Sequence, residues 1–166
     1  MNIRVLKPED AEPYHKLRLQ ALREHPEAFG SAFEDEADLP LSSVAERLQP
    51  TSDNAILGAW LDNALVGLLS FARYRGRKTR HRAMIGAMYV APEVRGRGIG
   101  SALLNEAIHH ARALADLEEL ILAVTVGNET ARSLYQATGF APSHIERRYI
   151  KVDNQYYDIE WMTMQL

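Results

Sequence analysis

Cysteine is absent from this chain of 166 residues. Its absence excludes a disulfide framework, a thiolate metal site and a cysteine nucleophile, so an acyl-cysteine step is excluded as well. No apolar run approaches the ~20 residues that a membrane-spanning helix needs. The first residues also lack the apolar stretch of a signal peptide. We therefore expect a cytoplasmic protein that does not enter a membrane.

Metal and nucleic-acid motifs are also missing. None of the six histidines has a helical metal spacing with a nearby carboxylate, as in His-Glu-x-x-His, so we expect no metal. A net charge of −3 gives no overall attraction to nucleic acid, which is the least favoured partner. The composition, 46% hydrophobic and 25% charged, is that of a globular protein, and the length predicts a single domain over residues 1–166.

Charge is distributed unevenly. Residues 24–38 are rich in acid, whereas residues 73–82 hold six of the nineteen basic residues. The basic segment has three readings: a solvated loop, a contact with the 3′-phosphate of a nucleotide cofactor, or a site for an acidic partner. The acidic segment favours a cationic ligand.

Hydrophobic patterning predicts a mixed sheet flanked by helices. A long acidic loop, with room for a helical turn, is expected over 25–40, and Asp62-Asn63 predicts a tight hairpin turn. Asn128 is expected to cap a helix that stops at Gly139. The predicted strands are 2–6, 55–61, 65–74, 83–90, 120–126, 143–152 and 156–166, and the other predicted helices are 8–24, 42–48 and 102–115.

The glycine-rich turn between the strand 83–90 and the helix 102–115 is the most informative stretch. It places three glycines within five residues, Gly96, Gly98 and Gly100, beside Arg95 and Arg97. A helix start leaves about four amide N–H groups unpaired and carries roughly half a positive charge. Glycines let a ligand approach those amides without a Cβ in the way. The turn therefore predicts an anion site for a phosphate-bearing cofactor.

Two motifs together resemble the GNAT N-acetyltransferase superfamily. Residues 95–100 fit its Arg/Gln-x-x-Gly-x-Gly/Ala signature, and 88–92 resemble the end of its fourth strand. Residues 128–140 are similar to its second cofactor motif, Asn-x-x-Ala-x-x-x-Tyr-x-x-x-Gly-Phe. The resemblance covers nearly the whole chain in element order. It implies a mixed, mostly antiparallel α/β (α+β) sheet of six to seven strands, flanked by about four helices and splayed between strands four and five.

The resemblance also implies the cofactor and the residues that bind it. Acetyl-CoA would be the cosubstrate, with its pyrophosphate on the glycine turn and its pantetheine arm along the strand edge. Asn128 would contact the arm, and Tyr135 would reach the thioester sulfur. The implied cofactor-binding residues are Met88, Tyr89, Val90, Arg95, Gly96, Arg97, Gly98, Ile99, Gly100, Ser101, Asn128, Ala131 and Tyr135.

The implied reaction is direct attack by a primary amine on acetyl-CoA. Tyr135 is the expected acid for the departing thiolate; the alternative is a tyrosine that only packs. A base is also needed. Many family members use a glutamate on strand four or five, but the corresponding strands here, 83–90 and 120–126, carry no acid. Glu34 is the expected base among the loop candidates Glu34, Asp35 and Glu36. The next candidates are Asp158 and Glu160, and the remaining alternative is a water chain to bulk solvent.

The acceptor is expected to be a small-molecule or peptide amine, with a cationic acceptor favoured by the acidic segment. The alternative function is a non-catalytic acyl-CoA sensor or interaction module. The resemblance makes a homodimer through the last strands a further expectation.

Overall fold

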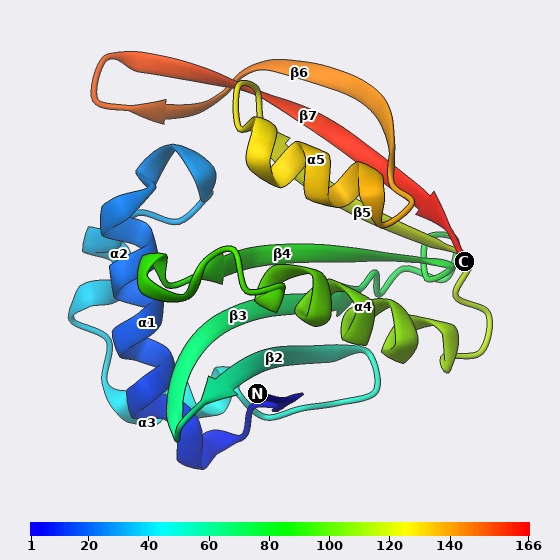
Figure 1. The fold of residues 1–166 in the computed structure, drawn as a ribbon. Coiled ribbons are helices and arrows are strands. Elements are labelled where there is room, and N and C mark those ends of the chain that lie inside the picture. Colours follow the sequence, from blue (N-terminus) through cyan, green and yellow to red (C-terminus); the bar gives the residue numbers. More distant parts are fainter.

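Every strand joins one seven-stranded sheet in the computed structural model, which describes residues 1–166 (Figure 1). The strand order is β1-β2-β3-β4-β5-β7-β6. The strands are β1 (Asn2–Val5), β2 (Asn54–Leu61), β3 (Ala64–Arg73), β4 (Arg82–Val90), β5 (Glu119–Thr125), β6 (Ala141–Val152) and β7 (Gln155–Gln165). The helices are α1 (Ala11–Glu24), α2 (Phe33–Ala37), α3 (Leu41–Arg47), α4 (Ile99–Arg112) and α5 (Glu129–Ala137), with the 3-10 turns η1 (Pro8–Asp10), η2 (Pro26–Ala28) and η3 (Pro92–Val94).

The sheet is split in its middle. β4 and β5 are the one parallel pair, and they pair only from Arg82 to Met84. Beyond Met84 the two strands diverge toward α1, as Figure 1 shows. A β-bulge lies in the diverging part of β4, where Ala87 has φ +48° and the register with β3 shifts. The expected mixed, mostly antiparallel sheet with a splay between strands four and five is confirmed.

Two hydrophobic cores cover the two faces of the sheet. On one face, α4 and α5 pack against the strands, with Leu103, Leu104 and Ala107 fully buried. On the other face, α1 and α3 cover β3 and β4 through a second cluster that contains Leu17 and Val44. The 3.6-residue spacing of apolar residues predicted the apolar stripe of α4. Burial of this stripe against the sheet holds the first turn of α4 beside the end of β4.

Local turn chemistry follows the sequence closely. Asp62 and Asn63 both have positive φ, +48° and +64°, as a two-residue hairpin turn between β2 and β3 requires. Asn128 caps α5 by accepting a hydrogen bond from the amide of Ala131 at 3.1 Å. The helix stops before Gly139, whose φ is +108°.

The predicted bounds of the long helix, 102–115, were wrong, since the helix spans Ile99–Arg112. It begins earlier because the glycine turn ends at Gly98 and the next residues already form the first helical turn. The acidic segment 25–40, for which a long loop with a helical turn was expected, holds the η2 turn and the short helix α2. None of the helices combines the length and the apolar character that crossing a membrane requires.

Candidate active site

The glycine turn presents unpaired amides at the start of α4. Gly96 and Gly98 both have φ +76°, a left-handed conformation that favours glycine. The first hydrogen bond of the helix runs from the amide of Ala102 to the carbonyl of Gly98 at 3.0 Å. The amides of residues 99–101 therefore have no intrahelical partner. Together with the helix dipole, these free amides are the geometry that the predicted anion site requires.

Gly100 brings three elements close together. A Cβ on Gly100 would lie 3.2 Å from Leu134 of α5 and 3.2 Å from Met88 of β4. Since that separation is tighter than ordinary van der Waals contact, a larger residue would have to push these two side chains aside, and glycine lets the start of α4 approach both neighbours without such a shift. The anion site is thereby held beside the split in the sheet.

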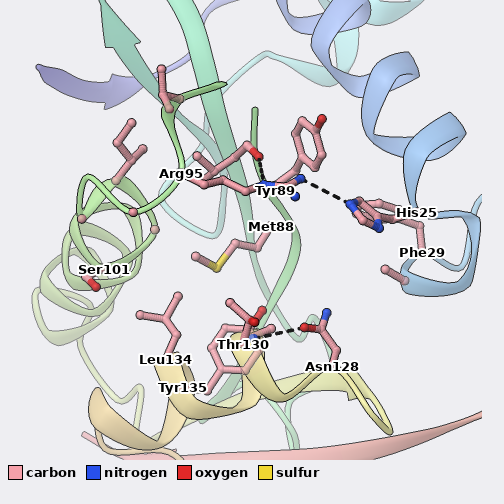
Figure 2. A pocket seen from close by; sticks show the side chains of 18 residues that line it. His25, Phe29, Met88, Tyr89, Arg95, Ser101, Asn128, Thr130, Leu134 and Tyr135 are labelled. Atoms are coloured by element: carbon pink, nitrogen blue, oxygen red, sulfur yellow. Dashed lines mark hydrogen bonds between the residues drawn. The ribbon is translucent and has the colours of Figure 1, made fainter. Parts of the chain in front are cut away.

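A cleft of about 620 Å³ runs from the glycine turn into the split (Figure 2). β4 forms one wall, and because its residues after Met84 have no partner on β5, part of its backbone edge is open to a ligand. Met88, Val90 and Ser101 line the cleft with Asn128 and Ala131. Twelve of the thirteen residues predicted to bind the cofactor lie here: Met88, Tyr89, Val90, Arg95, Gly96, Gly98, Ile99, Gly100, Ser101, Asn128, Ala131 and Tyr135. Arg97 is exposed and does not line the cleft.

Tyr135 reaches the cleft from α5. Its side chain is 8% exposed and packs against Phe140, with ring centroids 6.3 Å apart. Burial raises the pKa of Tyr135 to about 12, and no neighbouring charge opposes the shift. The hydroxyl is therefore protonated at neutral pH and able to donate a hydrogen bond into the cleft.

The η2 turn closes the opposite side of the cleft, and the sequence reasoning missed its role. His25 and Phe29, which flank η2, line the cleft across from Ser101 (Figure 2). Arg95 contacts the Nε2 atom of His25 at 3.3 Å through Nη2 and donates from Nε to the carbonyl of Val90 at 2.9 Å. The hydroxyl of Thr125 donates to the carbonyl of Glu27 at 2.8 Å.

A second cleft, of about 680 Å³, adjoins the first at Phe29, which lines both. It lies between the segment from α1 to α2 and the end of the β6–β7 hairpin. Charged residues of both signs surround it: Arg23 and Lys151 with Glu34 and Asp153. Phe29 is the residue that the two clefts share.

Comparison with known proteins adds the family. Residues 12–140 match the acetyltransferase (GNAT) family. This chain belongs to the GNAT family. It is 33% identical over 99 residues to N-alpha-acetyltransferase RimI of Mycobacterium tuberculosis, an alignment that spans 60% of this chain and 60% of that relative's length.

Solved GNAT structures share the fold. An acetyltransferase of GNAT family from Streptococcus pneumoniae superposes with a TM-score of 0.90 at 23% identity, covering 99% of this chain and 98% of that one. A GNAT phosphinothricin acetyltransferase from Sinorhizobium meliloti, solved in complex with AcCoA, superposes with a TM-score of 0.82 at 21% identity, covering 99% and 88%. At these identities the likeness establishes the fold.

The acids considered as bases in this GNAT chain lie in different surroundings. Glu36 is buried, and its carboxylate accepts from Arg18 at 3.0 Å and lies 3.4 Å from Arg47. Burial works to raise the pKa of Glu36, but the bonds and charges of Arg18 and Arg47 outweigh it and the pKa is lowered. Glu36 is thus a structural ion-pair partner, not a base.

The remaining acids are separated from the cofactor cleft. Glu160 pairs with Arg132 at 2.7 Å, and Asp158 accepts from the amide of Arg148 at 2.8 Å. Glu34 and Asp35 are exposed on α2, and Glu34 lines only the second cleft. No group of three or more histidine and acidic side chains is arranged to hold a metal.

The basic segment lies far from the glycine turn. It connects β3 to β4 and so sits at the start of β4, whereas the turn follows its end, about 26–30 Å away for a nine-residue strand. The buried side chain of Arg73 holds the segment in place by donating hydrogen bonds to the carbonyl oxygens of Arg80 and Ala115. The hypothesis that this segment contacts a cofactor 3′-phosphate was wrong, because the strand separates the two.

Proposed function

We propose that residues 1–166 form one N-acetyltransferase domain that moves an acetyl group from acetyl-CoA to a primary amine. The observation that carries this proposal is the pairing of two features in one cleft: unpaired amides at the start of α4 and the open edge of β4. The first suits a pyrophosphate and the second suits an extended amide-containing arm. Membership of the GNAT family supports the same reading.

The residues present fit coenzyme A. The left-handed glycines leave open space, since a Cβ at Gly96 or Gly98 would meet no atom within 4 Å. Arg95 and Arg97, on either side of Gly96, add positive charge to the turn. The pyrophosphate would be held by residues 95–101, and the pantetheine arm would pair with the backbone of Met88, Tyr89 and Val90.

The α5 helix supplies the rest of the donor site in this proposal. The Oδ1 atom of Asn128 caps the helix, which leaves its amide NH₂ free to contact the arm beside Ala131. Tyr135 would face the thioester sulfur. The leaving group is the thiolate of a thiol whose pKa is about 8.5, and it can accept a hydrogen bond from the phenol. Because the pKa of the buried phenol is raised to about 12, this hydrogen bond, rather than early proton transfer, would stabilise the leaving group.

The amine must lose a proton before it attacks. A lysine-like amine with a pKa of about 10.4 is only ~1 part in 2,500 neutral at pH 7, a deficit of roughly 4–5 kcal/mol. Glu34 stays a prediction for this base, from its place on the second cleft. There it would act on an acceptor that reaches the donor cleft past Phe29.

The second cleft is our proposed acceptor site. Three of the six acids of the 24–38 segment have side-chain partners: Glu24 accepts from Tyr89, Glu27 pairs with His25 and Glu36 pairs with Arg18. The cationic acceptor stays a prediction that rests on Glu34 and Asp153. Arg23 and Lys151 equally suit an acceptor with a carboxylate, such as an amino acid.

The test is a panel of amines assayed for release of coenzyme A, followed by mass analysis of the product. The panel contains spermidine, phosphinothricin and a peptide with a free N-terminal alanine, which represent a polyamine, an amino acid and a peptide amine. A product heavier by one acetyl group supports the proposal. Tight binding of acetyl-CoA without turnover on any amine would favour the alternative, a non-catalytic acyl-CoA sensor. A homodimer stays a prediction and is measured by light scattering.

A further inference from the structure

The η2 turn crosses the split between β4 and β5. On the β4 side, His25 contacts Arg95 and lies against Tyr89, with ring centroids 6.4 Å apart. On the β5 side, Thr125 donates to the carbonyl of Glu27. The segment from His25 to Phe29 therefore lies across the split near the carboxyl ends of β4 and β5, where the edge of β4 is open. A thioester in the split would face this segment.

The hydrogen bonds around His25 assign its tautomer. A guanidinium only donates, so the Nε2 atom of His25 accepts the bond from Arg95 and carries no proton. In the neutral ring the proton then lies on Nδ1, 3.4 Å from the carboxylate of Glu27. A carboxylate thus lies beside Nδ1, while the Nε2 atom faces Arg95 on the wall of the cleft, an arrangement that suits a histidine base.

We propose that His25 is the general base of the acetyl transfer, and that Arg95 covers its basic nitrogen until the cofactor binds. The proposal rests on the proposed function, since it assigns the missing base of that reaction. Arg95 borders the glycine turn, and a pyrophosphate bound there is a stronger partner for a guanidinium than a neutral imidazole. Donor binding therefore draws the guanidinium of Arg95 to the phosphate and exposes Nε2.

The proton balance is complete with these groups. Nε2 of His25 takes one proton from the ammonium of the acceptor, and the freed nitrogen lone pair forms the bond to the acetyl carbonyl carbon. The carbon–sulfur bond breaks, and its electron pair stays on sulfur, which Tyr135 stabilises by hydrogen bonding. The nitrogen loses a second proton, which ends on the thiol of coenzyme A. His25 releases the first proton to solvent, so each turnover yields the amide, coenzyme A and one proton.

The charged groups that face His25 come from three sides. Glu24 at the end of α1 accepts from the hydroxyl of Tyr89 at 2.6 Å and lies 3.9 Å from Arg95. Glu27 in η2 faces Nδ1, and Arg95 after η3 faces Nε2. The hydrogen bond from Tyr89 is the main cause that lowers the pKa of Glu24. The carboxylate of Glu24 thus already accepts a hydrogen bond from Tyr89. Of the groups around the cleft, this leaves His25 to take the proton of the acceptor amine.

Position favours His25 over Glu34. His25 lines the cleft that also contains Met88 and Tyr135, whereas Glu34 lines only the second cleft. A base must come within about 3 Å of the attacking nitrogen, directly or through one water. That nitrogen must reach the thioester in the split, where His25 already lies.

The experiment compares His25→Gln, Glu34→Gln and the control His109→Asn in the chain of residues 1–166, with the best amine of the panel as acceptor. His109 is exposed on α4 and lines neither cleft. For His25→Gln we expect kcat to fall by about 100-fold or more. The acid limb of the pH profile should disappear, while the Kd for acetyl-CoA changes by less than about threefold. Added imidazole should restore part of the rate to His25→Ala.

The outcomes separate the two proposals. If His25→Gln keeps the wild-type kcat and acid limb, His25 is not the base, while acetyl transfer by the wild-type chain still supports the proposed function. Loss of the acid limb in Glu34→Gln instead would assign the base to Glu34. If the wild-type chain acetylates no amine, the proposed function itself fails. In an NMR titration with coenzyme A, an unchanged Nε2 resonance of His25 would refute the displacement of Arg95.

Discussion

Replacing Gly98 by alanine separates the conformational role of the glycine turn from its role in binding. Gly98 has φ +76° and ψ 6°, and a Cβ there would meet no protein atom within 4 Å. The cost to folding is therefore the left-handed backbone alone, about 1–2 kcal/mol for a residue with a Cβ. For a chain of this size that corresponds to a fall in Tm of roughly 2–8 °C.

The effect on coenzyme A should be larger than this strain predicts. The open space beside Gly98 is the approach to the unpaired amides of residues 99–101, so the new methyl group would stand where the pyrophosphate approaches. Losing one charge-assisted hydrogen bond costs about 1.5–3 kcal/mol, which is roughly 10- to 150-fold in Kd. Calorimetric titration with coenzyme A measures the Kd, and differential scanning calorimetry measures the Tm.

Gly139→Ala is the matched control. Gly139 also has positive φ, +108°, but it follows α5 and lies outside the cleft, and a Cβ there would make an ordinary contact 3.4 Å from Met164. We expect a comparable fall in Tm with an unchanged Kd. If Gly98→Ala binds coenzyme A as tightly as the wild type, or if both variants lose affinity equally, the placement of the pyrophosphate on this turn is refuted.

Three further predictions concern side chains. Tyr135→Phe should lower kcat by about 100-fold with little change in the Kd for acetyl-CoA. Because burial raises the pKa of Tyr135 to about 12, its contribution should persist up to about pH 10 in rate profiles, and an undiminished kcat would exclude its role in stabilising the leaving thiolate. Glu36→Gln leaves Arg18 buried without its partner and should cost about 3–5 kcal/mol in urea unfolding. The pKa of Glu36 is lower in the folded than in the unfolded state, so its ionised form stabilises the fold fully above about pH 5. The difference in the free energy of unfolding between wild type and variant should therefore narrow as the pH falls through the folded pKa. A difference that widens in acid would contradict this. Asn128→Ala should lower the free energy of unfolding by about 1 kcal/mol, because the amide of Ala131 loses its cap. Asn128→Ser should retain most of that stability, since serine also caps helices. Equal Tm values for the two variants would show that the cap contributes nothing.

Local chemistry made much of the fold predictable. The Asp62-Asn63 turn, the cap by Asn128 and the apolar stripe of α4 depend on residues near one another in the chain, so sequence spacing alone carries them. The two cofactor motifs predicted which residues gather in the first cleft, apart from Arg97, because each motif lies on one continuous turn or helix.

The parts that sequence reasoning missed depend on distant contacts. Glu36 resembled the exposed acids beside it, yet Arg18 from α1 and Arg47 from α3 bury and neutralise it. His25 had no recognisable motif, because its partner Arg95 lies 70 residues away and meets it only after the sheet forms. One local feature was present: a histidine directly before a proline that ends a helix, next to the acidic segment.

The short pairing of β4 with β5 has a consequence for how the protein fluctuates. In an ordinary sheet the central amides exchange their hydrogens most slowly and the edges most quickly. Here the strands separate after Met84, so amides of β4 near Met88 that point into the split lie at the centre of the sheet without a strand partner. The centre of the sheet should therefore exchange rapidly in the free protein, and amide exchange at these positions gives a direct local readout of how fully the donor site is occupied.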